Sequence, residues 1–238
     1  MQEFKHLSEH LYVYTFGEET DRPNLFYIKG KDYSVAIDAG NSKRHLDSFY
    51  NELTKHNLPL PEKTIISHWH WDHSFAIPYA QGKTISSVKT YEKLREVSKW
   101  EWTKEAMEKR LETKEDIPFC HEFIQKEYPD LNEIKVKLPG EYIDIDTIYD
   151  LGDIKVYLYP KDSTHSRDSI FVYLPSEEAL IVQDADNVDF YHGEVYFQDK
   201  LKEMINFFES IDYKYHYLGH DERCTKEEAL DYLRGYLL

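Results

Sequence analysis

The chain has 238 residues and carries 29 lysines and arginines against 45 aspartates and glutamates, which gives a formal net charge of −16. This acid excess works against sequence-independent binding of nucleic-acid phosphates or of an anionic membrane surface, and no apolar run approaches the roughly 18 residues that a membrane-spanning helix needs. The two cysteines, Cys120 and Cys224, lie far apart without CxxC spacing, which excludes a disulfide framework and a cysteine zinc site.

The N-terminal half of the chain predicts strands that alternate with helices. Its first residues, MQEFKHLSEH, lack the apolar core of a signal peptide, so we expect a cytoplasmic protein. Strands are predicted where β-branched and aromatic residues are bounded by polar or glycine turns, and helices where apolar residues recur at helical spacing. The strands expected here are 11–16, 25–29, 33–38, 64–67 and 83–88, and the helices are 44–56 and one that begins near residue 72.

The second half begins with a change in composition. From about residue 90 to 128 the chain is dense in glutamate and lysine, and we expect two or three helices inserted into the alternating pattern. No linker, repeat or low-complexity stretch follows, so we predict one domain over residues 1–238, with strands covered by helices on both outer faces. The later strands are expected at 142–145, 148–151, 154–159, 169–174 and 179–183, and the later helices at 200–210 and 226–237.

A cluster of histidines follows the strand expected at 64–67. In the segment SHWHWDH, His68 and His70 are two positions apart, so in an extended chain their imidazoles leave on the same side. Two neutral imidazoles on one side begin a transition-metal site. Asp72 and His73 come as the chain turns into the next helix and can face a second ion. The alternative, a solvated polar loop, would leave three histidines exposed beside two tryptophans.

Six residues do not complete two metal sites, so further ligands should come from other strand ends. His165, Asp184 and His220 each follow a short apolar stretch. Loops just past strand ends are where layered α/β folds commonly hold their ligands. These three residues are therefore the candidates that would complete the set.

The order of these pieces resembles the metallo-β-lactamase superfamily. That family has an early Asp at a strand end, then HxHxDH, a lone His, a lone Asp and a His near the C-terminus, and here the pieces are Asp38, residues 68–73, His165, Asp184 and His220. The resemblance implies an αβ/βα sandwich of four layers, an α/β (α+β) fold in which two β-sheets pack together with helices on both outer faces. It also implies a metal pair at the sheet edge. The His beside the Asp of the motif is more similar to the thioesterase, lactonase and phosphodiesterase branches than to the lactamases proper.

The resemblance implies a role for each of these residues. The first ion would be held by His68, His70 and His165, the second by Asp72, His73 and His220, and Asp184 would bridge the two. By the same analogy Asp38 would orient the HxHxDH loop without binding a metal, the alternative being a turn-forming residue before Gly40.

The function implied is a hydrolase that uses two divalent ions per chain, which we expect to be zinc, with iron and manganese as alternatives. The ions would turn a bridging water into hydroxide, and Asp72 would position it and take up its proton. We expect a small-molecule ester, thioester or lactone as substrate, and a phosphodiester as second choice. The alternative is a mononuclear iron dioxygenase that acts on persulfides, which resembles the same fold and keeps HxHxDH. The acidic charge and the lack of a basic, aromatic-interleaved tract speak against RNA processing.

All the tryptophans fall in the metal motif or in the helical segment. Because Trp69 and Trp71 alternate with the histidines, we expect Trp69 to pack beneath the loop, and Trp71 is a candidate for the substrate pocket. Residues near 100–123 would cover the metal site and set substrate size. A plain contact between helix and sheet is the alternative for Trp100 and Trp102.

Overall fold

The strands form two mixed sheets in the computed structural model, which describes residues 2–238. In spatial order the first sheet contains β1 (Phe4–His6), β2 (Leu11–Tyr14), β3 (Leu25–Lys29), β4 (Ser34–Ile37), β5 (Lys63–Ile65), β6 (Lys83–Ser87) and β7 (Glu141–Ile143). The second contains β13 (Cys224–Thr225), β12 (Tyr215–Leu218), β11 (Ala179–Gln183), β10 (Ser169–Leu174), β9 (Lys155–Lys161) and β8 (Thr147–Asp150). The helices are α1 (Lys43–Lys55), α2 (Trp71–Ser74), α3 (Val88–Val97), α4 (Lys104–Thr113), α5 (Pro118–Glu127), α6 (Gln198–Ser210) and α7 (Lys226–Arg234).

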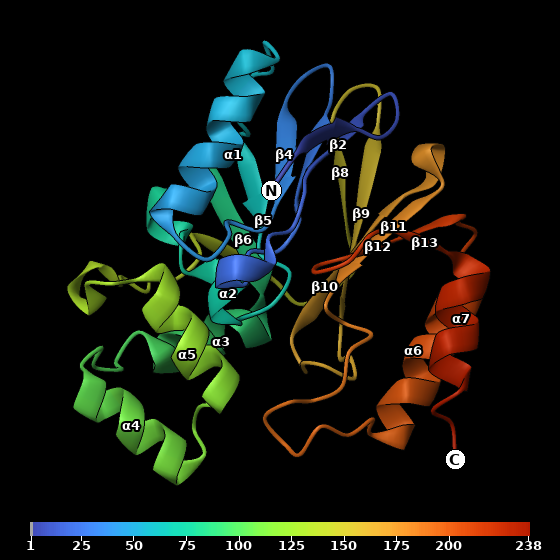
Figure 1. Cartoon of the computed structure of the whole chain (residues 1–238). Helices are drawn as coiled ribbons and strands as arrows, with labels where there is room; N and C mark the ends of the chain where they lie inside the picture. The colour runs from blue at the N-terminus through green and yellow to red at the C-terminus, as the bar shows by residue number, and fades with distance from the viewer. Residues whose placement is uncertain (1) are drawn as a thin grey trace.

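The two sheets pack face to face with helices outside, as Figure 1 shows for α1 on one side and for α6 and α7 on the other. Strand β3 illustrates the cause, because its side chains alternate between faces and all but the last are buried. Phe26 and Ile28 belong to the core between the sheets, whereas Leu25 and Tyr27 pack under α1. A third apolar cluster joins the second sheet to α6 and α7. The predicted four-layer αβ/βα sandwich is therefore confirmed.

Strand direction brings the loops after several strands to one edge. Strands β4, β5 and β6 are parallel neighbours, and β11 is parallel to β12. Strand β9 has the same direction as β11, because both pair antiparallel with β10. Every residue expected at the metal site lies in the segments that directly follow β4, β5, β9, β11 and β12, with Asp72 and His73 on the short helix α2 after β5.

Helices α3, α4 and α5 lie in the segment between β6 and β7 where an inserted helical region was expected. They enclose an apolar cluster on the short helix α2. This cluster contains Trp71 from the metal motif and Phe75 just after it, together with Val97, Met107 and Ile124 from the three helices. The helix expected from residue 72 is thus a single turn that ends at Ser74. Within residues 2–238, no helix is long and apolar enough to span a membrane.

Replacing Met107 by alanine should lower the free energy of unfolding by about 2–5 kcal/mol, the usual cost of truncating a buried methionine. Met107 has no exposed surface and fills the cluster on α2. Urea denaturation measures the change, with Glu108→Ala on the exposed side of the same helix as control. An equal, small effect of both substitutions would show that α4 does not support the motif.

Candidate metal centre

The side chains predicted as metal ligands lie together in two adjoining groups. In each group, one nitrogen or oxygen from every residue lies within 4.8 Å of the others. All are buried except His220, which is partly exposed. The first group is His68, His70 and His165, and the second is Asp72, His73, Asp184 and His220.

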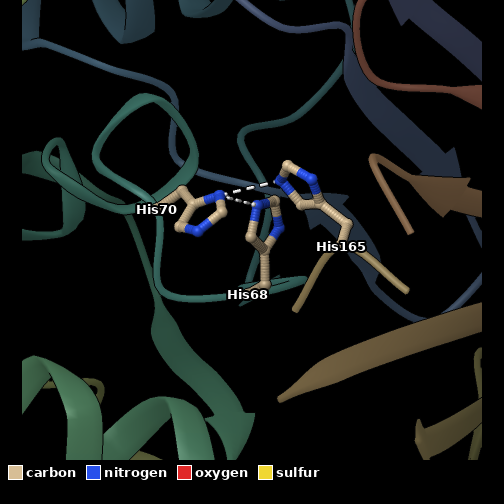
Figure 2. Close-up of side chains that lie close together, drawn as sticks. All are labelled: His68, His70 and His165. Carbon is tan, nitrogen blue, oxygen red and sulfur yellow. Dashed lines mark hydrogen bonds between the residues drawn. The ribbon is translucent and has the colours of Figure 1, made fainter. Parts of the chain in front are cut away.

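The first group forms because the chain runs extended after β5 and turns into α2 only after His70. Nε2 of His68 lies 3.0 Å from Nδ1 of His70, as expected for imidazoles two positions apart. His165, from the loop after β9, places its Nε2 2.9 Å from the same Nδ1 atom. Figure 2 shows the rings with these nitrogens turned toward one another.

Hydrogen bonds on the far side of two rings fix which nitrogen carries the proton. The Ser67 hydroxyl donates to Oδ2 of Asp38 at 2.8 Å, so it accepts from Nδ1 of His68 at 3.0 Å. Nδ1 of His165 donates to the carbonyl oxygen of Val188 at 3.0 Å. The Nε2 atoms of His68 and His165 therefore carry lone pairs that face the same point. Outer hydrogen bonds of this kind are typical of metal-binding histidines.

The second group is arranged around two carboxylates. Oδ2 of Asp72 lies 2.9 Å from Nε2 of both His73 and His220. Oδ2 of Asp184 lies 3.1 Å from Nε2 of His73, 3.6 Å from that of His220 and 3.8 Å from Nε2 of His165 in the first group. Asp184 thus lies between the groups. Its Oδ1 atom is buried without a hydrogen-bond partner in residues 2–238, and a bound cation would satisfy it.

Backbone geometry aims Asp184 into this position. The pairing of β11 with β12 shifts register between Ile181 and Gln183, and Gln183 has a left-handed φ of 55°. Gly219 lets the opposite loop pass close by, because a Cβ there would lie 1.9 Å from Oδ1 of Asp184. Strained backbone of this kind gathers at functional sites.

The two groups have different electrostatics. Burial holds the pKa of His68 and His70 well below its ordinary value, and neighbouring histidines lower it further, so both rings are neutral, the form that binds a metal. Burial also lowers the pKa of His73, but Asp72 and Asp184 outweigh it and hold that pKa well above its ordinary value. The two carboxylates of the second group therefore stabilise positive charge between them, which a divalent cation would also supply.

Asp38 makes the contacts that an orienting role requires. Its Oδ1 accepts from the backbone N–H of Ser67 at 2.6 Å. Its Oδ2 accepts from the Ser67 hydroxyl, from Nδ1 of His73 at 2.7 Å and from the Gln183 amide at 2.6 Å. Asp38 also has a φ of 66°, the turn conformation that was its alternative interpretation. One carboxylate thus fixes the motif loop, the ring of His73 and the end of β11.

We expect Asp38→Asn to weaken zinc binding by about 10–100-fold, the usual effect of losing such an outer partner. The amide of asparagine would place N–H groups opposite the donors that now share Oδ2 of Asp38, so some of these hydrogen bonds would be lost. Competition with a zinc chelator measures the affinity. Asp153→Asn, in an exposed turn where the carboxylate accepts from the N–H of Lys31, is the matched control. Equal affinities in the two variants would refute the role.

The expectation for the tryptophans is wrong in one respect. Trp71, the candidate for the substrate pocket, is 3% exposed and packs in the cluster on α2. The cause is that α2 begins at Trp71, so the alternation of side chains ends one residue earlier. Trp69 is the half-buried one, and its ring centroid lies 4.7 Å from that of His70.

Two further aromatic residues beside the first group carried no signal in the sequence. Ring centroids of Phe190 and His165 are 5.7 Å apart, and those of Tyr191 and His70 are 5.3 Å apart. The Tyr191 hydroxyl lies 3.5 Å from Sγ of Cys120 on α5. The helical segment therefore reaches the site through a contact with this loop, and whether it governs substrate size stays a prediction.

Comparison with solved structures gives matches over almost the whole chain. A metallo-β-lactamase from Pontibacter korlensis superposes with a TM-score of 0.70 at 15% identity, covering 98% of this chain and 99% of that one. The chain has the metallo-β-lactamase fold. The metallo-β-lactamase DIM-1 matches with a TM-score of 0.67 at 14% identity over 99% and 96% of the two chains, and VMB-1 with 0.65 at 16% over 99% and 95%.

The metallo-β-lactamase fold is the fold that the resemblance of the short motifs implied. No protein-family model matches the chain, and no curated protein matches its sequence. At identities of 14–16% the similarity to the solved structures establishes the fold alone. Activity therefore has to be argued from the site itself.

Proposed function

We propose that the chain is a metal-dependent hydrolase that holds two divalent ions, one in each group. The observation that carries the proposal is the direction of the lone pairs: outer partners hold the protons of His68 and His165 away from the centre. Both inward nitrogens face Nδ1 of His70, which can donate a proton to only one of them. At least one close contact between lone pairs therefore remains, which is unfavourable unless a cation lies between the rings. The position of Asp184 between the groups supports a pair of ions.

The donor set fits zinc, since imidazole and carboxylate are its common ligands beside thiolate. His68, His70 and His165 would hold one ion, Asp72, His73 and His220 the other, and Asp184 would bridge them. Bound divalent ions would lower the pKa of a coordinated water toward neutrality and polarise a substrate oxygen.

Asp72 is the residue that we assign to proton handling. Burial favours the neutral acid, but His73 and His220 outweigh it and hold the pKa of Asp72 well below its usual range, so the group is a carboxylate. A carboxylate held between two imidazoles can orient a water molecule and accept its proton. His220 is the most exposed side chain of the second group, at 28%, so a small substrate would approach from its side.

The substrate class that we favour is a carboxylic ester, thioester or lactone, with a phosphodiester second. A panel of chromogenic substrates of these classes, run on zinc-loaded and on metal-free protein, tests the proposal. Hydrolysis of one class should depend on zinc and return when zinc is restored. Oxygen uptake with a persulfide by iron-loaded protein, without any hydrolysis, would support the dioxygenase alternative instead.

A further inference from the structure

Asp168 joins the loops of the first group through a single buried carboxylate. It is 5% exposed and lies three positions after His165. Its Oδ2 accepts from the backbone N–H of Trp69 at 2.9 Å. Its Oδ1 accepts from the hydroxyl of Ser166 in a short hydrogen bond. Trp69 stands between His68 and His70, and Ser166 is next to His165. Through these two residues the carboxylate is hydrogen-bonded to a sequence neighbour of each histidine in the group.

The first turn of α3 anchors Asp168 from behind. The Thr90 hydroxyl lies 2.7 Å from Oδ2 of Asp168, and the Ser87 hydroxyl donates to its backbone carbonyl at 2.9 Å. Ser87 is also the N-cap of α3, where its oxygen accepts from the N–H of Thr90. Because Ser87 and Thr90 are buried, these bonds form away from water. Helix α3 thus provides a rigid base for the loops.

We infer that Asp168 is a positioning residue, which sets the spacing of His68, His70 and His165 by holding their loops against α3. The inference rests on the proposed metal binding. Without the carboxylate, the N–H of Trp69 would lose its acceptor, and the partly buried donor would be left without a protein partner. The motif loop and the His165 loop would then be free to separate. We expect the affinity of the first group for a metal to fall by about 10–100-fold, the usual effect of removing such a partner.

Cobalt titration of the metal-free protein tests the inference, because the visible absorption of bound Co²⁺ reports ligand geometry independently of activity. Asp168→Ala should weaken binding of one of the two ions and change the spectrum. Asp168→Asn should restore both, since its amide oxygen can accept from Trp69 and Thr90 while its N–H donates to Ser166. Glu127→Gln is the control, a fully buried carboxylate that binds Arg22 and Ser42 instead of the ligand loops.

Each result decides the question. The inference is overturned if the Asp168→Ala variant binds cobalt with the affinity and spectrum of the unmutated protein. It is also overturned if Asp168→Ala loses cobalt affinity and Asp168→Asn does not restore it. If the alanine variant fails to fold, Ser166→Ala and Thr90→Val remove one donor each, and unchanged cobalt binding in both overturns it too. Failure of the unmutated protein to bind cobalt would instead refute the proposed function.

Discussion

Asp184→Ala should reduce the metal content from about two ions per chain toward one, because a bridging carboxylate holds paired ions roughly 3.5–4 Å apart. Two cations at that distance repel each other, so the more weakly held ion should leave when the anion is removed. Hydrolysis should fall with it. Elemental analysis after dialysis without chelator measures the content.

Asp186→Asn is the matched control for this experiment. Asp186 lies in the same turn and is similarly buried, but its Oδ2 faces Nε2 of His216 at 3.3 Å. This variant should keep both ions. If the Asp184→Ala protein also keeps both ions and remains folded by circular dichroism, Asp184 does not bridge the two ions.

Asp72→Asn should lower kcat by about 10²-fold or more, the scale expected for loss of a group that handles the proton. Asparagine has nearly the same shape but no charge, so it also weakens the second ion. Measuring kcat at saturating zinc separates the two effects, because restored metal content with low kcat isolates the proton step. Asp221→Asn, an exposed neighbour of His220 that accepts from the N–H of Glu222, is the control. Full kcat together with full metal content in the Asp72 variant would refute the assignment.

Elements with a strong apolar pattern could be predicted from the sequence. Strands 25–29, 169–174 and 179–183 have the predicted bounds, because nearly every side chain in them is buried on one face or the other. Strands β1 and β13 were not predicted. Strand β1 is largely exposed and polar, and β13 contains only Cys224 and Thr225, so neither carries a periodic signal.

The candidate ligands could be predicted because they follow strand ends in a recognisable order. The residues that hold these side chains in place could not be predicted, because they act through contacts between segments that are distant in the sequence. The bond from Trp69 to Asp168 spans 99 positions, and the contact of Cys120 with Tyr191 spans 71. Trp71 was assigned to the pocket on the assumption of an extended chain, and the onset of α2 turned its side chain into the core instead.

The central claim is that one chain holds a pair of ions, and the metal content of the unmutated protein tests it most directly. Protein produced without added metal and dialysed without chelator should contain about two divalent ions per chain, chiefly zinc, as a two-metal hydrolytic site requires. A single iron per chain, with oxygen uptake on a persulfide, would contradict the account.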